Sequence, residues 1–299
     1  MKIAAVDIGG TAVKSCLWDG GRPFRPEEVR ETPARAAEGG EAVLRQVEQI
    51  LSSMPEAEAV AVSTAGQVDP VRGSIIFATD NIPGYTGMPV KKILEESLHR
   101  PVLVENDVNA AAVGEAEFGA GRDFRDFLCL TFGTGIGGAI VMDHRLYRGA
   151  SCSAAEMGHI LTHAGGRRCT CGNRGCYEAY ASTSALSRLV LERSGLHLNG
   201  RQIFAAAREN GNVRTALEEW MHEVIWGLVS LIHVFNPPCV ILGGGIMKEV
   251  SVVRYIRGHL PDFLMESFRG VRICRAELGN SAGLLGAARL AENLFQNQK

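Results

Sequence analysis

The chain has 299 residues, 46% hydrophobic and 21% charged, which suits a globular protein of two modest domains and not a disordered chain. Its formal net charge is −2 and charges of both signs are interspersed, so no broad basic field would attract nucleic acid or an anionic membrane. The N-terminus lacks an export signal, and no apolar stretch reaches the roughly 18 residues that a membrane span needs. We therefore expect a cytoplasmic protein that binds neither nucleic acid nor membrane.

The first part of the sequence predicts a β-hairpin followed by alternating helices and strands. Apolar residues at 3–6 and 13–18 predict two strands around a glycine turn. The apolar spacing after them predicts a helix at 43–51, a strand at 59–62, a region rich in Gly, Pro and Asp at 63–87 and a second helix at 90–98. A further strand at 102–104 and a third helix at 110–118 follow.

The same pattern begins again near Phe127, which indicates an internal repeat. The second part predicts two strands, at 127–132 and 139–142, around a glycine turn. Three helices, at 182–193, 201–208 and 213–235, and a further strand at 240–242 follow. Open α/β sheets bind ligands at the carboxyl ends of their strands, so two such halves predict an α/β fold of two lobes with a ligand between them. We place the smaller lobe at 1–108, joined by a last helix at 282–299, and the larger at 109–281.

Three glycine turns are candidates for holding a nucleotide. The first follows Asp7, a candidate Mg²⁺ ligand through water, and offers backbone N–H groups, a hydroxyl and a cation in Gly9, Gly10, Thr11 and Lys14. The second lies between two strands, which argues against a dinucleotide site, and comprises Gly133, Thr134 and Gly135. The third surrounds Gly244. An ordinary turn also explains each of them, and none matches the pattern of a P-loop kinase.

Asp107 is the candidate general base. It follows the strand at 102–104 and precedes a helix, so its carboxylate is expected at the carboxyl end of a strand. Phosphoryl transfer needs an aspartate to accept the hydroxyl proton, with Mg²⁺ and oriented donors to stabilise the moving charge. The alternative is that Asn106 or Asp107 only caps the following helix.

His159 and the cysteines at 169, 171 and 176 form an H-x9-C-x-C-x4-C pattern. Three cysteines within eight residues, beside polar residues and glycines, are not explained by core packing. One imidazole and three thiolates would complete a tetrahedral zinc site, so we expect a structural Zn²⁺ held by His159, Cys169, Cys171 and Cys176. Free thiols and a redox disulfide are the alternatives for this cluster. We expect the other five cysteines to be small buried apolar residues.

Taken together, these motifs resemble the ROK family of sugar kinases and related regulators over nearly the whole chain. The motifs that carry the resemblance are residues 7–14, Glu105-Asn106-Asp107, residues 133–138, Glu156-Met157-Gly158-His159, the cysteine loop ending in Glu178, and residues 243–245. The resemblance implies an actin-like ATPase (ribonuclease H-like) fold that closes over ATP and a hexose, with Asp107 activating the 6-hydroxyl. It also implies a set of sugar contacts, namely Gly66, Asn106, Asp107, Glu156, His159 and Glu178.

The family resemblance leaves two functions open. The first is an ATP-dependent kinase of glucose or a close relative, with N-acetylmannosamine and β-glucosides as alternatives. The second is a sugar-sensing regulator without turnover; such members carry a helix-turn-helix before the first glycine motif, for which the start of that motif at Asp7 leaves no room. We favour the kinase and expect a homodimer or higher homo-oligomer. One departure from the family pattern is Ser153-Ala154-Ala155, where many members have a glycine before the glutamate.

Overall fold

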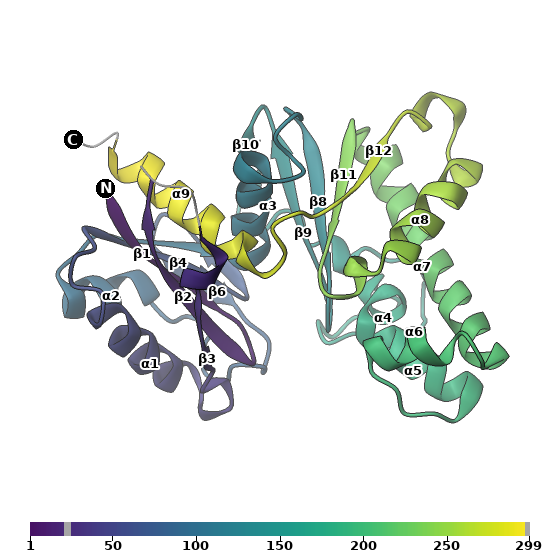
Figure 1. Cartoon of the computed structure of the whole chain (residues 1–299), viewed down its shortest axis with the longest axis horizontal. Coiled ribbons are helices and arrows are strands. Elements are labelled where there is room, and N and C mark those ends of the chain that lie inside the picture. Colours follow the sequence, from purple (N-terminus) through teal and green to yellow (C-terminus); the bar gives the residue numbers. More distant parts are fainter. Residues whose placement is uncertain (21–24, 297–299) are drawn as a thin grey trace. The chain divides into compact units, whose positions relative to one another are not determined.

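The computed structural model describes residues 1–20 and 25–296, and the chain forms two compact units (Figure 1). The first unit comprises Met1–Asp123, Leu146–Ala154 and Asn280–Lys299. The second comprises Phe124–Arg145 and Ala155–Gly279. The chain thus leaves the first unit after Asp123, returns to it for nine residues, and ends in it.

The first unit is built on a five-stranded sheet of order β3-β2-β1-β4-β7. β1 pairs antiparallel with β2 and parallel with β4, which in turn pairs parallel with β7. These strands are β1 (Lys2–Ile8), β2 (Ala12–Asp19), β3 (Arg30–Pro33), β4 (Ala59–Thr64) and β7 (Val102–Asn106). The predicted hairpin and parallel strands are confirmed. Three short strands were not predicted, namely β3, β5 (Gln67–Asp69) and β6 (Ser74–Phe77).

Helices cover both faces of this sheet. Alternate β1 residues such as Val6 pack into a core with α1 (Gly40–Ser52) and α2 (Val90–Leu98). The opposite face, which carries Asp7, is covered by α9 (Ala282–Gln296), and α9 also packs closely along α3 (Asp107–Phe118) (Figure 1). A Cβ at Gly283 would lie 3.1 Å from Asp7 Oδ1, so the missing side chain lets α9 approach this carboxylate.

The second unit repeats the arrangement with a five-stranded sheet of order β10-β9-β8-β11-β12. β8 and β9 form an antiparallel hairpin, and β8, β11 and β12 are parallel. The strands are β8 (Phe127–Phe132), β9 (Ile136–Met142), β10 (Arg145–Leu146), β11 (Cys239–Gly243) and β12 (Arg272–Arg275). The boundary between the units falls within β10, so Leu146 is counted with the first unit. The equivalent positions of the two hairpins bear out the internal repeat expected from the sequence.

Helices of the second unit bury one face of its sheet. The long helix α7 (Gly211–Phe235) has the predicted apolar face in the core, and its Trp220 is fully buried and donates Nε1–H to Ser182 O at 3.0 Å. The remaining helices of this unit are α4 (Glu178–Ala181), α5 (Thr183–Ser194), α6 (Gly200–Ala206) and α8 (Val250–His259). α8 and β12 were not predicted.

Short 3₁₀ helices complete the described chain: η1 (Pro26–Glu28), η2 (Ala36–Glu38), η3 (Met157–His159), η4 (Ile246–Lys248), η5 (Leu260–Phe263), η6 (Glu266–Phe268) and η7 (Gly279–Ser281). The predicted last helix is present as α9, and the end of the predicted range, 297–299, lies outside the described residues. Among residues 1–20 and 25–296, no helix combines the length and apolarity required to cross a bilayer.

Candidate active site

The glycine turn of the first unit joins β1 to β2. The N–H of Gly9 donates to Ala12 O at 3.0 Å, which closes the turn, and a Cβ at Gly10 would meet open space. Thr11 is exposed beside it. The turn therefore exposes backbone and a hydroxyl, as a phosphate-binding turn requires.

Asp7 lies in β1 one residue before the strand ends, and the two neighbouring strands supply its partners. The register places Lys14 of β2 and Ser63 of β4 opposite it. Ser63 donates its hydroxyl to Asp7 Oδ1 at 2.6 Å, and Lys14 Nζ lies 3.7 Å from Oδ2. Burial nevertheless raises the pKa of Asp7, because the hydrogen bond and Lys14 do not fully offset the loss of water. Ser63 was not recognised from the sequence.

Asn106 and Asp107 lie at the junction of β7 and α3. Asn106 caps the helix, since its Oδ1 accepts from the N–H groups of Val108 at 2.9 Å and Asn109 at 3.0 Å. Its Nδ2 donates to Asp107 Oδ1 at 3.0 Å and to Gly66 O at 2.9 Å. The capping role considered above is thus real for Asn106, and the same amide connects Gly66 to Asp107. Gly66 has φ +101°, a conformation that favours glycine.

Asp107 is half-buried and begins the first turn of α3. Burial is the largest influence on its carboxyl and, with the negative charge of Asp7, raises its pKa to about 7. Hydrogen bonds from Asn106 and from the N–H of Val108 at 2.9 Å oppose this rise. A carboxylate with this pKa accepts a proton readily near neutral pH, which is the property a general base needs.

Glu105, the residue before Asn106, is buried and paired with Arg148. Its Oε2 accepts from Arg148 Nη2 at 2.6 Å and Nε at 3.1 Å. Its Oε1 accepts from the N–H of Asn106 and from Asn109 Nδ2, both at 3.0 Å. No local pattern indicates this pair, because 43 residues separate its members.

In the second unit, the turn Gly133–Gly135 joins β8 to β9. Gly133 and Thr134 are exposed, and the N–H of Gly133 donates to Gly135 O at 3.0 Å. A Cβ at Gly135 would lie 2.5 Å from Glu178 Oε2, so the absence of a side chain makes room for this carboxylate. Gly244, at φ +95°, follows β11 and would crowd the backbone of Phe132 if it carried a Cβ. The second and third predicted glycine turns therefore lie beside each other.

His159, Cys169, Cys171 and Cys176 form one cluster, in which a ligand atom from each lies within 4.8 Å of the others. Cys169 Sγ is 3.5 Å from His159 Nδ1, and Cys171 Sγ is 3.6 Å from Cys176 Sγ. Three sulfur atoms and one imidazole nitrogen at such spacings match the donor set of a closed tetrahedral zinc site. Of the other five cysteines, three are buried as expected, whereas Cys152 and Cys274 are only partly buried, so for these two that interpretation is wrong.

Glu178 links this cluster to the second glycine turn. Its Oε1 accepts from Thr170 Oγ1 at 3.0 Å, and Cys169 Sγ lies 3.1 Å from the same atom. Its Oε2 accepts from the N–H of Ile136 at 3.3 Å. Glu156 lies on the other side of His159, with Oε2 3.9 Å from Nε2. The second unit therefore gathers Glu156, His159 and Glu178 around the cysteine loop.

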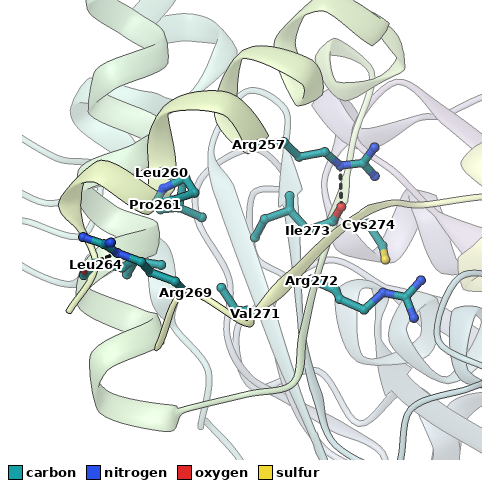
Figure 2. A pocket seen from close by; sticks show the side chains of 9 residues that line it. All are labelled: Arg257, Leu260, Pro261, Leu264, Arg269, Val271, Arg272, Ile273 and Cys274. Carbon is teal, nitrogen blue, oxygen red and sulfur yellow. Dashed lines mark hydrogen bonds between the residues drawn. The ribbon is translucent and has the colours of Figure 1, made fainter. Parts of the chain in front are cut away.

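A separate hollow of about 370 Å³ lies in the second unit between α8, η5 and β12 (Figure 2). Its lining includes Arg257, whose Nε donates to Ile273 O at 2.7 Å, together with Arg269 and Arg272. None of the nine lining residues is a carboxylate or one of the predicted site residues. This hollow thus offers no general base and is not part of the candidate active site.

Each of the two sheets contains a hairpin followed by parallel strands, and this arrangement belongs to the actin-like ATPase fold, as the family resemblance implied. Residues 3–294 match the model of the ROK family, and the chain belongs to this family. It is 35% identical to a glucokinase of Streptomyces coelicolor and 33% identical to a β-glucoside kinase of Listeria innocua, over 96% of both chains in each case.

A solved structure gives the same picture. The crystal structure of a ROK family glucokinase from Streptomyces griseus, in complex with glucose and AMPPNP, superposes with a TM-score of 0.86 at 33% identity. The match covers 98% of this chain and all of that one. The predicted family and fold are therefore confirmed.

Proposed function

We propose that this protein is an ATP-dependent sugar kinase that phosphorylates the 6-hydroxyl of glucose or a close relative, with Asp107 as general base. The observation that carries the proposal is the state of Asp107: a half-buried carboxyl at the start of a helix, with its pKa raised to about 7. Such a group is ionised in a large fraction of molecules at neutral pH and still basic enough to accept an alcohol proton as the oxygen attacks phosphorus. The relatives, glucokinases and β-glucoside kinases, support the same chemistry.

The sugar contacts are proposed from the family motifs and supported by the contacts within each unit. In the first unit, the Asn106 amide donates to both Gly66 and Asp107 and would orient the base beside a sugar hydroxyl. In the second unit, Glu156, His159 and Glu178 present carboxylate and imidazole groups within one cluster. These groups suit a hexose, which offers hydrogen-bond donors and acceptors around its whole ring.

The nucleotide contacts are proposed at the exposed glycine turns. Gly9, Gly10 and Thr11 would meet phosphate through backbone N–H groups and a hydroxyl, with Lys14 nearby, and the turns at Gly133–Gly135 and Gly244 would admit the remainder of ATP. Asp7 would suit a Mg²⁺ site, because it is a carboxylate whose pKa is raised by burial, so that a bound cation would favour its charged form. Bound Mg²⁺ would supply positive charge to the phosphates. Asp7 would hold the ion, and Ser63 would orient Asp7.

We also propose that the cysteine cluster holds a structural Zn²⁺. Three thiolates and one imidazole leave no coordination position for a substrate, so the ion would shape the loop rather than react. The contacts of Glu178 with both the loop and the residue that follows the second glycine turn support this role. We further propose that the enzyme acts in the cytoplasm as a homo-oligomer.

The test is an ADP-release assay over a panel of sugars, namely glucose, N-acetylmannosamine and a β-glucoside. We expect the highest kcat/KM with glucose and a loss of at least about 100-fold in kcat for Asp107→Asn, because the variant retains the shape of the side chain without its basicity. Circular dichroism and sugar binding confirm that the variant is folded. Wild-type turnover in Asp107→Asn would remove the base from the mechanism, and sugar binding without turnover in the wild type would identify a sensor instead.

A further inference from the structure

We propose that Arg148 is a positioning residue for phosphoryl transfer: through Glu105 it fixes the start of α3, from which Asp107 projects. Arg148 lies 41 positions after Asp107 in the sequence and outside every motif that carries the family resemblance. The inference rests on the proposed role of Asp107 as general base. It adds a residue that acts on the base through others and does not touch the substrate.

The side chain of Glu105 contacts both Arg148 and the start of α3. This side chain is 2% exposed, and its two carboxylate oxygens have different hydrogen-bond partners. Oε1 accepts from Asn106 and Asn109, the residues on either side of the pair Asp107-Val108, whereas Oε2 is left to the two N–H groups of Arg148. Glu105 therefore holds the backbone of Asn106 and the side chain of Asn109, one on each side of Asp107-Val108, and Arg148 holds Glu105.

Arg148 lies in a short segment of the first unit that interrupts the second unit along the chain. Leu146–Ala154 belongs to the first unit, although Arg145 before it and Ala155 after it belong to the second. The segment is folded onto itself by the N–H of Ala154, which donates to Arg148 O at 3.1 Å. A second hydrogen bond, from Ser153 Oγ to Gln67 Oε1 at 3.2 Å, ties it to the residue after Gly66. The segment that leads into Glu156 is thus attached to the first unit beside Asn106, Asp107 and Gly66.

The ion pair between Arg148 and Glu105 does more than fill space. A buried carboxylate without a partner is unfavourable, and apolar residues of similar volume would often stabilise a fold equally well. Arg148 approaches one oxygen with two N–H groups of its guanidinium, which fixes direction as well as charge, and a lysine ammonium lacks this fork. A base must be placed within a fraction of an ångström of its working position, so the directional pair suits positioning.

The experiment compares Arg148→Met, Arg148→Lys and the double variant Arg148→Met/Glu105→Gln by the pH profile of kcat with glucose. We expect Arg148→Met to lower kcat by about 10- to 100-fold, because small displacements of a base have effects of this size. We also expect the acid limb of its pH profile, where kcat rises with pH, to move to higher pH, since Glu105 is left as an unbalanced negative charge near Asp107. Arg148→Lys restores the charge, so its acid limb stays near the wild-type position and its kcat is intermediate.

The double variant separates the effect of displacing Asp107 from the effect of an unpaired charge at Glu105. It contains no unpaired buried charge, so it folds even if Arg148→Met does not, and its acid limb returns toward the wild type while kcat remains low. The other charged groups that act on this site, Asp7 and Lys14, are unchanged in all variants. The matched control is Arg125→Met, which breaks the exposed pair with Asp143 and should leave both kcat and the profile as in the wild type.

Two outcomes would overturn the proposal. One is wild-type kcat with an unmoved acid limb in Arg148→Met. The other is a loss of activity that only follows the folded fraction, with the same profile in all three variants, which is the result of a purely structural role. Failure of the proposed function is recognised separately, because Asp107→Asn would then retain turnover.

Discussion

Asp7 raises the pKa of Asp107, although the two residues lie on different elements, one in β1 and the other at the start of α3. Burial contributes more than this repulsion, and the hydrogen bonds from Asn106 and Val108 oppose both. The outcome is a carboxyl that titrates near neutral pH. Two carboxylates of different function in one unit are a common way to adapt such groups to acid–base chemistry.

The pH dependence of turnover should follow from this arrangement. Asp107 accepts a proton only when it is ionised, so kcat/KM for the sugar should rise with pH and level off above a midpoint of about 7. Bound Mg²⁺ would move the midpoint of kcat to lower pH, because a nearby cation favours the carboxylate. The measurement is a pair of pH profiles, with the unfolding midpoint followed over the same range as a control for stability. A flat kcat/KM from about pH 5 to 8 would contradict the role of Asp107.

The stability of Asp107→Asn should also depend on pH. The pKa of Asp107 is raised from 3.8 to about 7 in the folded protein, so the folded state binds its proton more tightly than the unfolded chain. Wild-type stability is therefore reduced as pH rises from about 4 through 7, and the asparagine variant, which cannot ionise, escapes this loss.

We expect Asp107→Asn to be more stable than the wild type by about 1 to 3 kcal/mol at pH 8, and the difference to shrink toward pH 4. Urea unfolding at both pH values measures it. A variant less stable than the wild type by the same amount at both pH values would show that the carboxyl is not destabilised in the folded state.

The sequence predicted those parts of the site that depend on neighbours in the chain. The turn after Asp7, the position of Asp107 between a strand and a helix, and the cysteine cluster are local, because spacing within ten or so residues determines them. The predicted α2 and β8 even have the observed bounds.

The contacts that orient these groups could not be predicted, because they join distant segments. Ser63 reaches Asp7 through the pairing of β1 with β4, and Arg148 reaches Glu105 only after the chain has passed through the second unit and returned. Nothing in the local pattern around Ser63 or Arg148 distinguishes them from other polar residues. The short strands β3, β5, β6, β10 and β12 were missed for a related reason, since each has only two to four residues from which periodicity can be judged.

Metal content provides a test of the cysteine cluster. We expect about one zinc per chain by elemental analysis and its loss in Cys171→Ser, because a closed site needs all four ligands. A strong chelator should lower the unfolding temperature of the wild type and have little effect on the variant. Cys152→Ser is the control, since Cys152 lies outside the cluster. Wild-type protein that contains no metal after expression in zinc-supplemented medium, and is indifferent to the chelator, would disprove the site.

Ala155 is one of the three residues before Glu156, a stretch in which many members of the family have a glycine, and its φ is +68°. An alanine in this left-handed conformation costs about 1 to 2 kcal/mol relative to its ordinary conformation, because its Cβ approaches the following carbonyl oxygen. The conformation is fixed by its surroundings: the N–H of Met157 donates to Ala155 O at 2.6 Å, and Gly138 of β9 packs directly against this carbonyl. The backbone at Ala155 thus has a left-handed conformation of the kind that glycine favours.

Ala155→Gly should therefore stabilise the protein. The glycine removes the strain but adds about 0.5 to 1 kcal/mol of conformational entropy to the unfolded chain, so we expect a net gain of about 0.5 to 1 kcal/mol in urea unfolding. The control is Ala154→Gly, one residue earlier, where φ is not positive and only the entropic cost applies, so this variant should be less stable than the wild type. If both variants lost stability equally, the left-handed conformation of Ala155 would not be strained, and its difference from the family pattern would have no energetic consequence.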